Sequence, residues 1–350
     1  MKRKIRAVLF GAGNMGRVSI RSMIDHDIEI VAAIGRNHNI GKDIGELAGI
    51  GPIGIPLEKN AEEVLARVEA DIAVISTESG VAQIAPLAKL CADHGMNVIT
   101  IAEALNYPWN TEPEATRELD EYMKAKGVTL FGTGLYDTIW NNIPLSLASA
   151  CNRVDEINMY CILGLEDMGK VVAEELYVGK TLEEYHALLA ETPVEENGLA
   201  RASMTYNYGN AATLRLTPDR EIISLDPILA EHDTYFPQWD ILVHKGELLG
   251  LEIVATLLTK ENIRLVYTSY FKAFAEGEEY CHVNHIDYKI MGDPDFHLVL
   301  DNVHGEVATA YCEVNRIPDV INARPGFVTV VDLGKPMYHA KPMQEYIETE

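Results

Sequence analysis

The residues Ile5-Arg6-Ala7-Val8-Leu9-Phe10 form a short apolar run, and Gly11-Ala12-Gly13-Asn14-Met15-Gly16 follows it directly. An amphipathic helical pattern comes next. A strand, a glycine-rich turn and a helix in this order are typical of a phosphate-binding turn: the first glycine permits the sharp turn, the second lets backbone approach a pyrophosphate, and the third allows close packing of helix on strand. The helix N-terminus adds N–H donors and partial positive charge. The stretch therefore predicts a dinucleotide site, with cofactor contacts from Gly11, Gly13, Asn14, Met15 and Gly16.

The remainder of the N-terminal part alternates strand and helix patterns. Predicted strands cover Ile5–Phe10, Ile28–Ile34, Ile72–Ser76, Asn97–Ile101 and Val128–Phe131. Predicted helices cover Met15–His26, Glu62–Val68, Val81–His94 and Glu112–Lys126. Short apolar strands that alternate with helices indicate a parallel sheet covered on both faces. We therefore predict an α/β fold whose residues 1–141 form a doubly wound Rossmann domain.

A different pattern starts near Asn142, where strand-like segments follow one another with few helices between them. Predicted strands cover Glu156–Leu163, Ala211–Leu216, Ile241–His244, Leu248–Leu258, Ile263–Ala273 and Phe296–Asp301. Helical patterns cover Leu182–Glu191 and Val303–Asn322, the second with a break at Pro318. Residues 142–302 are thus expected to form an α+β substrate and dimerisation domain with a largely antiparallel sheet. Residues 303–350 are expected to form a C-terminal helix and an irregular tail that return to the Rossmann domain.

Charge and composition exclude several classes of protein. With 29 Lys and Arg against 53 Asp and Glu, the net charge is −24, and such a field repels nucleic acids and anionic membranes. The apolar run behind the N-terminal Met1-Lys2-Arg3-Lys4 is too short for a signal peptide. Five widely spaced cysteines without a CxxC pair favour reduced thiols. We expect a cytoplasmic protein without nucleic-acid or membrane partners and, by analogy with other sheet-rich domains, a homodimer.

Two further loops follow predicted strands at the edge where the cofactor is expected. After the second strand, Arg36 and Asn37 stand where NAD-specific sites carry an acidic residue for the ribose hydroxyl. A guanidinium suits a 2′-phosphate instead, so NADP(H) is favoured, with NAD(H) use left open and a solvated arginine as the alternative. After the third long strand, Ser76 and Thr77 offer hydroxyls to the ribose or nicotinamide side of the cofactor; capping the next helix is their alternative role.

Glu103 follows the strand Asn97–Ile101, at the carboxyl end of a central strand and beside the expected nicotinamide position. Without other information, a carboxylate at such a place is either catalytic or merely solvated. The glycine turn, the stretch "IAEALNYPW" and the segment Val314–Leu333 together resemble the 2,4-diaminopentanoate dehydrogenase family, which includes the native amine dehydrogenases and is related to dihydrodipicolinate reductase in its cofactor domain. Glu103 matches the acidic residue of that family's E-x-x-x-Y-P stretch, and the resemblance implies that it is the catalytic carboxylate.

The resemblance implies NAD(P)-dependent reductive amination of a small ketone or aldehyde with ammonia, and the reverse oxidative deamination. The chain carries D-x-x-W at Asp137–Trp140 where diaminopentanoate-type members resemble G-x-N-P-G-F. This departure favours the amine dehydrogenase branch, with Leu135, Trp140 and Met168 as an apolar pocket wall. Packing between domains is the alternative role for Leu135 and Trp140.

Two alternative functions remain open, whereas a sugar dehydrogenase and a metal site are disfavoured. The alternatives are a diaminopentanoate-type amino acid dehydrogenase and a catalytically silent NADPH-sensing protein. A sugar dehydrogenase of the glucose–fructose oxidoreductase type is disfavoured because Ala104 stands where the lysine of its E-K-P motif is expected. His282 and His285 would face opposite sides of a strand, and no further ligand set is evident, so no metal site is predicted.

Overall fold

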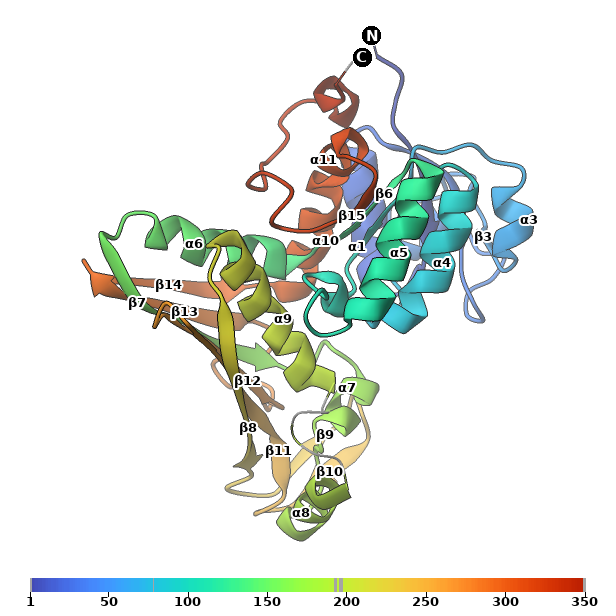
Figure 1. Ribbon diagram of the computed structural model, residues 1–350. Coiled ribbons are helices and arrows are strands. Elements are labelled where there is room, and N and C mark those ends of the chain that lie inside the picture. The colour runs from blue at the N-terminus through green and yellow to red at the C-terminus, as the bar shows by residue number, and fades with distance from the viewer. Residues whose placement is uncertain (1, 78, 192–193, 195–197, 349–350) are drawn as a thin grey trace. The chain divides into compact units, whose positions relative to one another are not determined.

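The computed structural model describes residues 2–77, 79–191, 194 and 198–348 (Figure 1). The chain divides into two compact units. The first comprises Met1–Asn142 and Glu306–Glu350, and the second comprises Ile143–Gly305. The sequence placed these boundaries at residues 141/142 and 302/303. The second unit is therefore an excursion between two parts of the first.

The first unit is built on a seven-stranded sheet in the order β15-β6-β5-β4-β1-β2-β3, and every strand pair in it is parallel. Its strands are β1 Arg6–Phe10, β2 Glu29–Ile34, β3 Leu57–Glu58, β4 Ile72–Ile75, β5 Asn97–Thr100, β6 Thr129–Gly132 and β15 Gly326–Val328. Strand order reverses on either side of β1, as in a doubly wound fold. The five strands predicted in this part are confirmed to within one or two residues, whereas β3 and β15 were not predicted.

Helices cover both faces of this sheet. They are α1 Asn14–Asp25, α2 Ile44–Leu47, α3 Ala61–Leu65, α4 Val81–Asp93, α5 Pro113–Lys126, α10 Gly305–Asn315 and α11 Ile317–Asn322. Alternate residues of β1 point into two separate cores: Val8 and Phe10 pack on the α4 and α5 side, and Ala7 and Leu9 on the α1 and α11 side. Because both faces of its strands are buried, β1 is apolar throughout, apart from Arg6 at its first position.

The C-terminal segment completes the first unit. β15 pairs with β6 at the edge of the sheet, and the Asp120 Oδ1 atom of α5 accepts a hydrogen bond from the Phe327 backbone N–H at 2.9 Å. The helical stretch predicted over Val303–Asn322 is two helices, separated at Arg316, because Pro318 lies in the first turn of α11 rather than inside a continuous helix. The tail also contains a short 3₁₀ helix, η4 Met343–Tyr346.

A buried ion pair joins this C-terminal segment to the end of the first part of the chain. Asp137 lies in a π-helix, η2 Tyr136–Asn142, and its carboxylate accepts from Arg316 Nε at 2.7 Å and Nη2 at 3.1 Å. The two side chains are 0% and 1% exposed. Thr133 Oγ1 and Asn142 Nδ2 also donate to Asp137, and Arg316 donates to Asp319. These bonds supply the hydrogen-bond partners that a buried charge pair requires.

The second unit contains a six-stranded sheet in the order β14-β13-β7-β12-β11-β8 and a two-stranded sheet, β10-β9. Strand bounds are β7 Arg153–Gly164, β8 Pro218–Leu229, β9 Thr234–Phe236, β10 Ile241–Val243, β11 Leu248–Thr259, β12 Arg264–Lys272, β13 Asn284–Asp293 and β14 Phe296–Val303. Only β7 and β12 pair in parallel; the other pairs of the large sheet are antiparallel. The sheet is thus mostly antiparallel.

The helices of the second unit are α6 Ile143–Ala148, α7 Lys170–Glu175, α8 Leu182–Glu191 and α9 Gly198–Thr213. The strand predicted over Ala211–Leu216 is wrong, because Ala211 to Thr213 form the last turn of α9. This helix packs on β11 and β12 and buries residues around most of its circumference. Its sequence therefore lacks the one-sided pattern of a surface helix, which hid it from the sequence reading. β8, β9 and β13 were also not predicted.

Two findings bear on the class of protein. Within the described ranges, none of the helices combines the length and apolarity needed to cross a membrane. All five cysteines carry free thiols.

The Asp137–Arg316 pair generates a stability prediction. Replacing Asp137 by Ala leaves a buried guanidinium without its main partner, and we expect a loss of about 3–5 kcal/mol in the free energy of unfolding. Asp155→Ala is the matched control, because it removes one partner of the exposed Arg153–Asp155 pair and should cost at most about 1 kcal/mol. Chemical denaturation of both variants measures the difference. Equal losses in the two variants would contradict the assigned role of the buried pair.

Candidate active site

The turn between β1 and α1 has the geometry of a phosphate cradle. Gly11 has a φ of +95°, and a Cβ there would lie 2.8 Å from the Ser76 carbonyl oxygen. A Cβ on Gly16 would lie 2.0 Å from the Gly11 oxygen, so this position also requires glycine. Gly13, by contrast, has no atom of the described residues, its chain neighbours and its own helix backbone apart, within 4 Å of its Cβ position. The turn is therefore closed on the protein side and open at Gly13, where a ligand could approach the backbone.

Two unused groups beside this turn suit an anionic ligand. Gly13 is the N-cap of α1 and provides no side-chain cap, which leaves the partial positive charge of the helix N-terminus available. Thr77 Oγ1, at the end of β4, is buried and has no hydrogen-bond partner among the described residues. An orphaned buried hydroxyl is costly unless a ligand or water satisfies it. The residues present thus fit the pyrophosphate and ribose of a dinucleotide.

Backbone hydrogen bonds hold the neighbouring loops at the same edge. The Gly11 N–H donates to Ile34 O at 2.8 Å, and the Ser76 N–H donates to Phe10 O at 2.9 Å. Arg36 and Asn37 follow β2 directly and are exposed. The predicted cofactor contacts of the β1, β2 and β4 loops therefore all lie at the carboxyl edge of one sheet, where doubly wound folds bind ligands.

Glu103 begins a short 3₁₀ helix, η1 Glu103–Leu105, just after β5. Its side chain keeps an exposed surface, although desolvation by the surrounding protein raises its pKa. No hydrogen bond to its carboxylate comes from the other described side chains. A small molecule can therefore reach a carboxyl group that holds its proton more tightly than an ordinary glutamate.

The turn that carries Glu103 is fixed from two sides. A Cβ on Gly132 would lie 2.4 Å from the Leu105 oxygen, so η1 packs directly on the end of β6. Tyr136 Oη donates to Ala102 O at 3.1 Å, and Asn106 Nδ2 donates to Asn141 Oδ1 at 3.0 Å. The π-helix thus contacts the residues before and after the Glu103 turn. Burial, followed by the nearby Glu103, raises the pKa of Tyr136 well above its usual value, which keeps this phenol neutral.

Glu313 of α10 is a second unusual carboxyl group, and the sequence reading missed it. It is fully buried and accepts from Ser19 Oγ at 2.9 Å and from Ser76 Oγ at 3.4 Å. Burial raises its pKa to about 8, so it is largely protonated near neutral pH. It links α10 to α1 and to the β4 loop, directly behind the cradle. No local motif signals it, because its partners are 294 and 237 residues away in sequence.

The predicted substrate-wall residues lie in different parts of the chain. Leu135 and Trp140 belong to the first unit and are 7% and 4% exposed. Met168 belongs to the second unit and is partly buried against that unit's own core. The low exposure of Leu135 and Trp140 also fits the packing role that the sequence left open, so their grouping with Met168 in one pocket stays a prediction.

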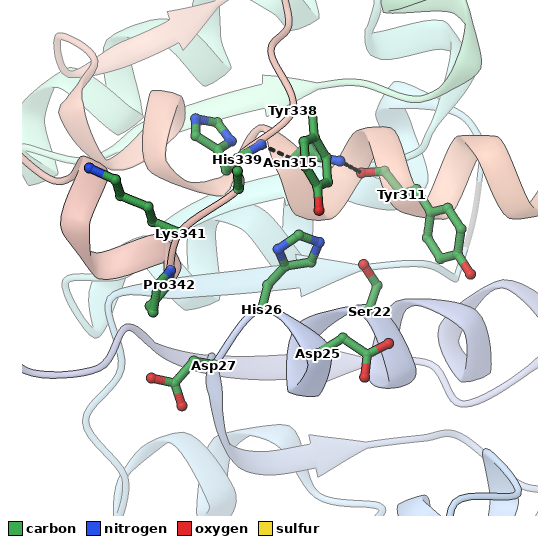
Figure 2. Close-up of a pocket in the computed structure, with 11 residues that line it drawn as sticks. Ser22, Asp25, His26, Asp27, Tyr311, Asn315, Tyr338, His339, Lys341 and Pro342 are labelled. Atoms are coloured by element: carbon green, nitrogen blue, oxygen red, sulfur yellow. Dashed lines mark hydrogen bonds between the residues drawn. The ribbon is translucent and has the colours of Figure 1, made fainter.

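A pocket in the first unit lies away from these residues. It is lined by the C-terminal end of α1, by α10 and by the tail, including His26, Tyr311 and Tyr338. In Figure 2 the His26 ring stands between Ser22 and Tyr338. Because the N-terminus of α1 forms the cradle, this pocket lies at the opposite end of that helix, and none of the predicted site residues lines it.

Glu313 gives a pH-dependent prediction. A pKa raised from 4.5 to about 8 means that the folded state retains a proton that the unfolded chain releases, so folding stability falls as the pH rises through this window. Glu313→Gln removes the titration. We expect the variant to gain stability relative to the wild type by up to about 4 kcal/mol between pH 5 and pH 8.

Urea denaturation at several pH values measures this difference. Exposed Glu121 on α5 supplies the control variant Glu121→Gln, which should follow the wild type at every pH. A Glu313→Gln curve parallel to that of the wild type would show that Glu313 ionises in the folded protein as it does in the unfolded chain.

Comparison with known proteins places this geometry among dehydrogenases. Residues 139–349 match the 2,4-diaminopentanoate dehydrogenase C-terminal domain, and residues 5–102 match the dihydrodipicolinate reductase N-terminus. The 2,4-diaminopentanoate dehydrogenase of Acetoanaerobium sticklandii is 25% identical over 95% of this chain and 94% of its own length. The amine dehydrogenase structure from Mycobacterium smegmatis superposes with a TM-score of 0.88 at 30% identity, covering 97% of this chain and 98% of that one.

A further relative matches only part of the chain. The 4-hydroxy-tetrahydrodipicolinate reductase of Archaeoglobus fulgidus is 33% identical over 27% of this chain and 34% of its own length. The N-terminal part of the first unit is therefore similar to reductases of another type, and the match of residues 139–349 distinguishes the chain from them.

Proposed function

The chain belongs to the 2,4-diaminopentanoate dehydrogenase family and is an oxidoreductase that acts on amino compounds, and we propose that it is an amine dehydrogenase with Glu103 as its catalytic carboxylate. The observation that carries the proposal concerns the Glu103 carboxyl group. Its side chain keeps a surface that a small molecule can reach, and desolvation by the surrounding protein raises its pKa. In the proposed reaction, a small ketone or aldehyde condenses with ammonia and is reduced to an amine. The reverse reaction is oxidative deamination.

The cradle would hold the nicotinamide cofactor, which supplies the hydride when bound. Gly11, Gly13, Asn14, Met15 and Gly16 would contact the pyrophosphate, and Ser76 and Thr77 the adjoining ribose. Support comes from the open face at Gly13 and from the orphaned Thr77 hydroxyl. Glu313 would act behind them by fixing the position of Ser76.

Glu103 would manage protons and charge. The Glu103 carboxylate takes a proton from an ammonium ion, and the ammonia that remains adds to the carbonyl carbon. When Glu103 returns this proton to the hydroxyl group of the adduct, water leaves and an iminium cation forms. The Glu103 carboxylate can hydrogen-bond the nitrogen, accept a proton from it and stabilise the positive charge before hydride arrives. A raised pKa brings this group toward the pH at which it can both take and return a proton. Neutral Tyr136, held against Ala102, keeps the turn in place without adding a competing charge.

Three of the five arginines of the second unit are held in ion pairs, which favours a substrate without a carboxylate; Arg215 and Arg220 form no ion pair among the described residues. Recognition of an amino acid calls for a cationic side chain. Arg153, Arg201 and Arg264 are each paired with an acidic residue of their own unit: Asp155, Glu221 and Glu156. Leu135, Trp140 and Met168 would then provide an apolar wall for a ketone or aldehyde.

The 25% identity to a 2,4-diaminopentanoate dehydrogenase over nearly the whole chain keeps an amino acid substrate as the second candidate. Oxidation of simple amines and of 2,4-diaminopentanoate with the same cofactor separates the two. The dehydrogenase relatives favour either enzyme over a silent NADPH-sensing protein. A homodimer in the cytoplasm remains part of the proposal.

Replacement of Glu103 by Gln tests the mechanism. The amide is close in shape but cannot accept the proton, so we expect kcat for ammonia-dependent oxidation of NADPH to fall by about 10²–10⁴-fold, with nucleotide affinity unchanged. Glu112→Gln is the matched control, since burial also raises the pKa of Glu112 but the residue lies at the N-cap of α5. Undiminished turnover in Glu103→Gln would refute the proposed role.

Replacement of Arg36 by Ala tests the cofactor choice. If the guanidinium meets the 2′-phosphate, Kd for NADPH should rise about 10-fold or more, whereas Kd for NADH should hardly change. Lys59→Ala provides the control, because Lys59 is an exposed cation just beyond β3, the neighbour of β2. Titration of each reduced cofactor by fluorescence measures both constants. An equal effect on the two cofactors would overturn NADP(H) preference.

A further inference from the structure

A group of metal-ligating side chains lies in the second unit, apart from the residues assigned above. It is formed by the loop after β7 and by the connection from β12 to β13. In the sheet, Gly164 at the end of β7 is paired with Lys272 at the end of β12, and Ile162 with His285 at the start of β13. The end of β7, the end of β12 and the start of β13 therefore meet at one edge, which brings Asp167 close to His282.

The donor atoms of Glu276, Cys281 and His282 all lie within 4.8 Å of one another. Among them, His282 Nε2 is 3.5 Å from Glu276 Oε2. His282 is not on a strand, because β13 begins at Asn284. It lies in the preceding turn with a φ of +64°. The sequence pattern placed His282 and His285 on one strand with their side chains on opposite sides. That placement is wrong for His282.

The other ring nitrogen of His282 is already held in place. His282 Nδ1 lies 3.0 Å from both carboxylate oxygens of Asp167. A carboxylate on one imidazole nitrogen fixes the tautomer and the ring orientation, and it leaves the second nitrogen free to bind a metal. In this geometry, Nε2 lies 3.5 Å from the Glu276 carboxylate, and the Cys281 thiol lies within 4.8 Å of a donor atom of both residues. The three side chains can therefore serve as metal ligands, and the Asp167 carboxylate orients the histidine among them.

We propose that Glu276, Cys281 and His282 bind a zinc ion, with Asp167 as the residue that positions the histidine. One thiolate, one imidazole and one carboxylate are a donor set suited to Zn²⁺, whereas Ca²⁺ and Mg²⁺ prefer oxygen ligands alone. Adjacent ligands of a tetrahedral zinc ion lie about 3–4 Å apart, so small side-chain rotations would close the set. Three protein ligands leave the fourth position to water.

The charge around Cys281 supports a cation at this place. Asp167 and Glu276 both lie within ion-pairing distance of His282, the residue next to Cys281. Two carboxylates thus flank the histidine beside the thiol, and a Cys281 thiolate would add a third negative charge. A divalent ion would offset this excess of negative charge. The rival arrangement is a plain ion pair, in which a protonated His282 bridges Asp167 and Glu276 without any metal.

Cobalt substitution distinguishes the two arrangements in the full-length protein. After treatment with a chelator, Co²⁺ is added under reducing conditions, and the near-ultraviolet band of thiolate-to-cobalt charge transfer is recorded. We expect one equivalent of Co²⁺ to produce the band and one equivalent of Zn²⁺ to abolish it. Cys281→Ser should lose the band. Cys151→Ser should keep it, because Cys151 lies after α6 with its thiol against Pro294 O.

A second variant guards against misfolding of Cys281→Ser. Asp167→Asn leaves all three ligands in place, and loss of its carboxylate should weaken Co²⁺ binding by about 10–100-fold. Absence of the band in the wild type, its survival in Cys281→Ser, or unchanged affinity in Asp167→Asn would each overturn the proposal. These readouts do not use turnover, so the result is independent of the proposed activity.

Discussion

The carboxylate of Asp137, buried against the guanidinium of Arg316, is the interaction on which the proposed active site depends. It ties the π-helix to the segment between α10 and α11, 179 residues further along the chain. The π-helix in turn supplies Tyr136 and Asn141, which hold the turn on both sides of Glu103. Neither charge could remain in this interior alone. The orientation of Glu103, the proposed catalytic carboxylate, therefore rests on a buried ion pair to which Glu103 itself does not belong.

Two carboxyl groups of the first unit hold their protons more tightly than usual, and accessibility separates their roles. Glu103 and Glu313 both have raised pKa values because of burial. Glu103 keeps an exposed surface, so it can exchange a proton with a bound molecule. Glu313 is fully buried behind the cradle and, among the described residues, accepts hydrogen bonds from the hydroxyls of Ser19 and Ser76. The first can take part in chemistry, whereas the second can only support the loops around it.

Local patterns in the sequence predicted the first unit well and the second less well. The β1 strand, the glycine turn and α1 are adjacent in the chain, so spacing alone was enough. The Asp137–Arg316 and Glu313–Ser19 contacts depend on residues brought together by folding, and a single sequence carries no sign of them. The error at Ala211–Leu216 has another cause, since α9 is buried on most sides and lacks helical periodicity in its polarity. His282 was wrongly placed on a strand because the sequence did not show where β13 begins.

The return of the C-terminal segment to the first unit sets an order of events during synthesis on the ribosome. Residues 143–305 can reach their full complement of strands while the last part of the chain is still in the exit tunnel. The first unit cannot, because β15, α10 and the Arg316 partner of Asp137 emerge last. A nascent chain stalled before residue 316 would present an uncompensated buried anion and an unfinished sheet edge, which are features that chaperones and proteases recognise in incomplete products.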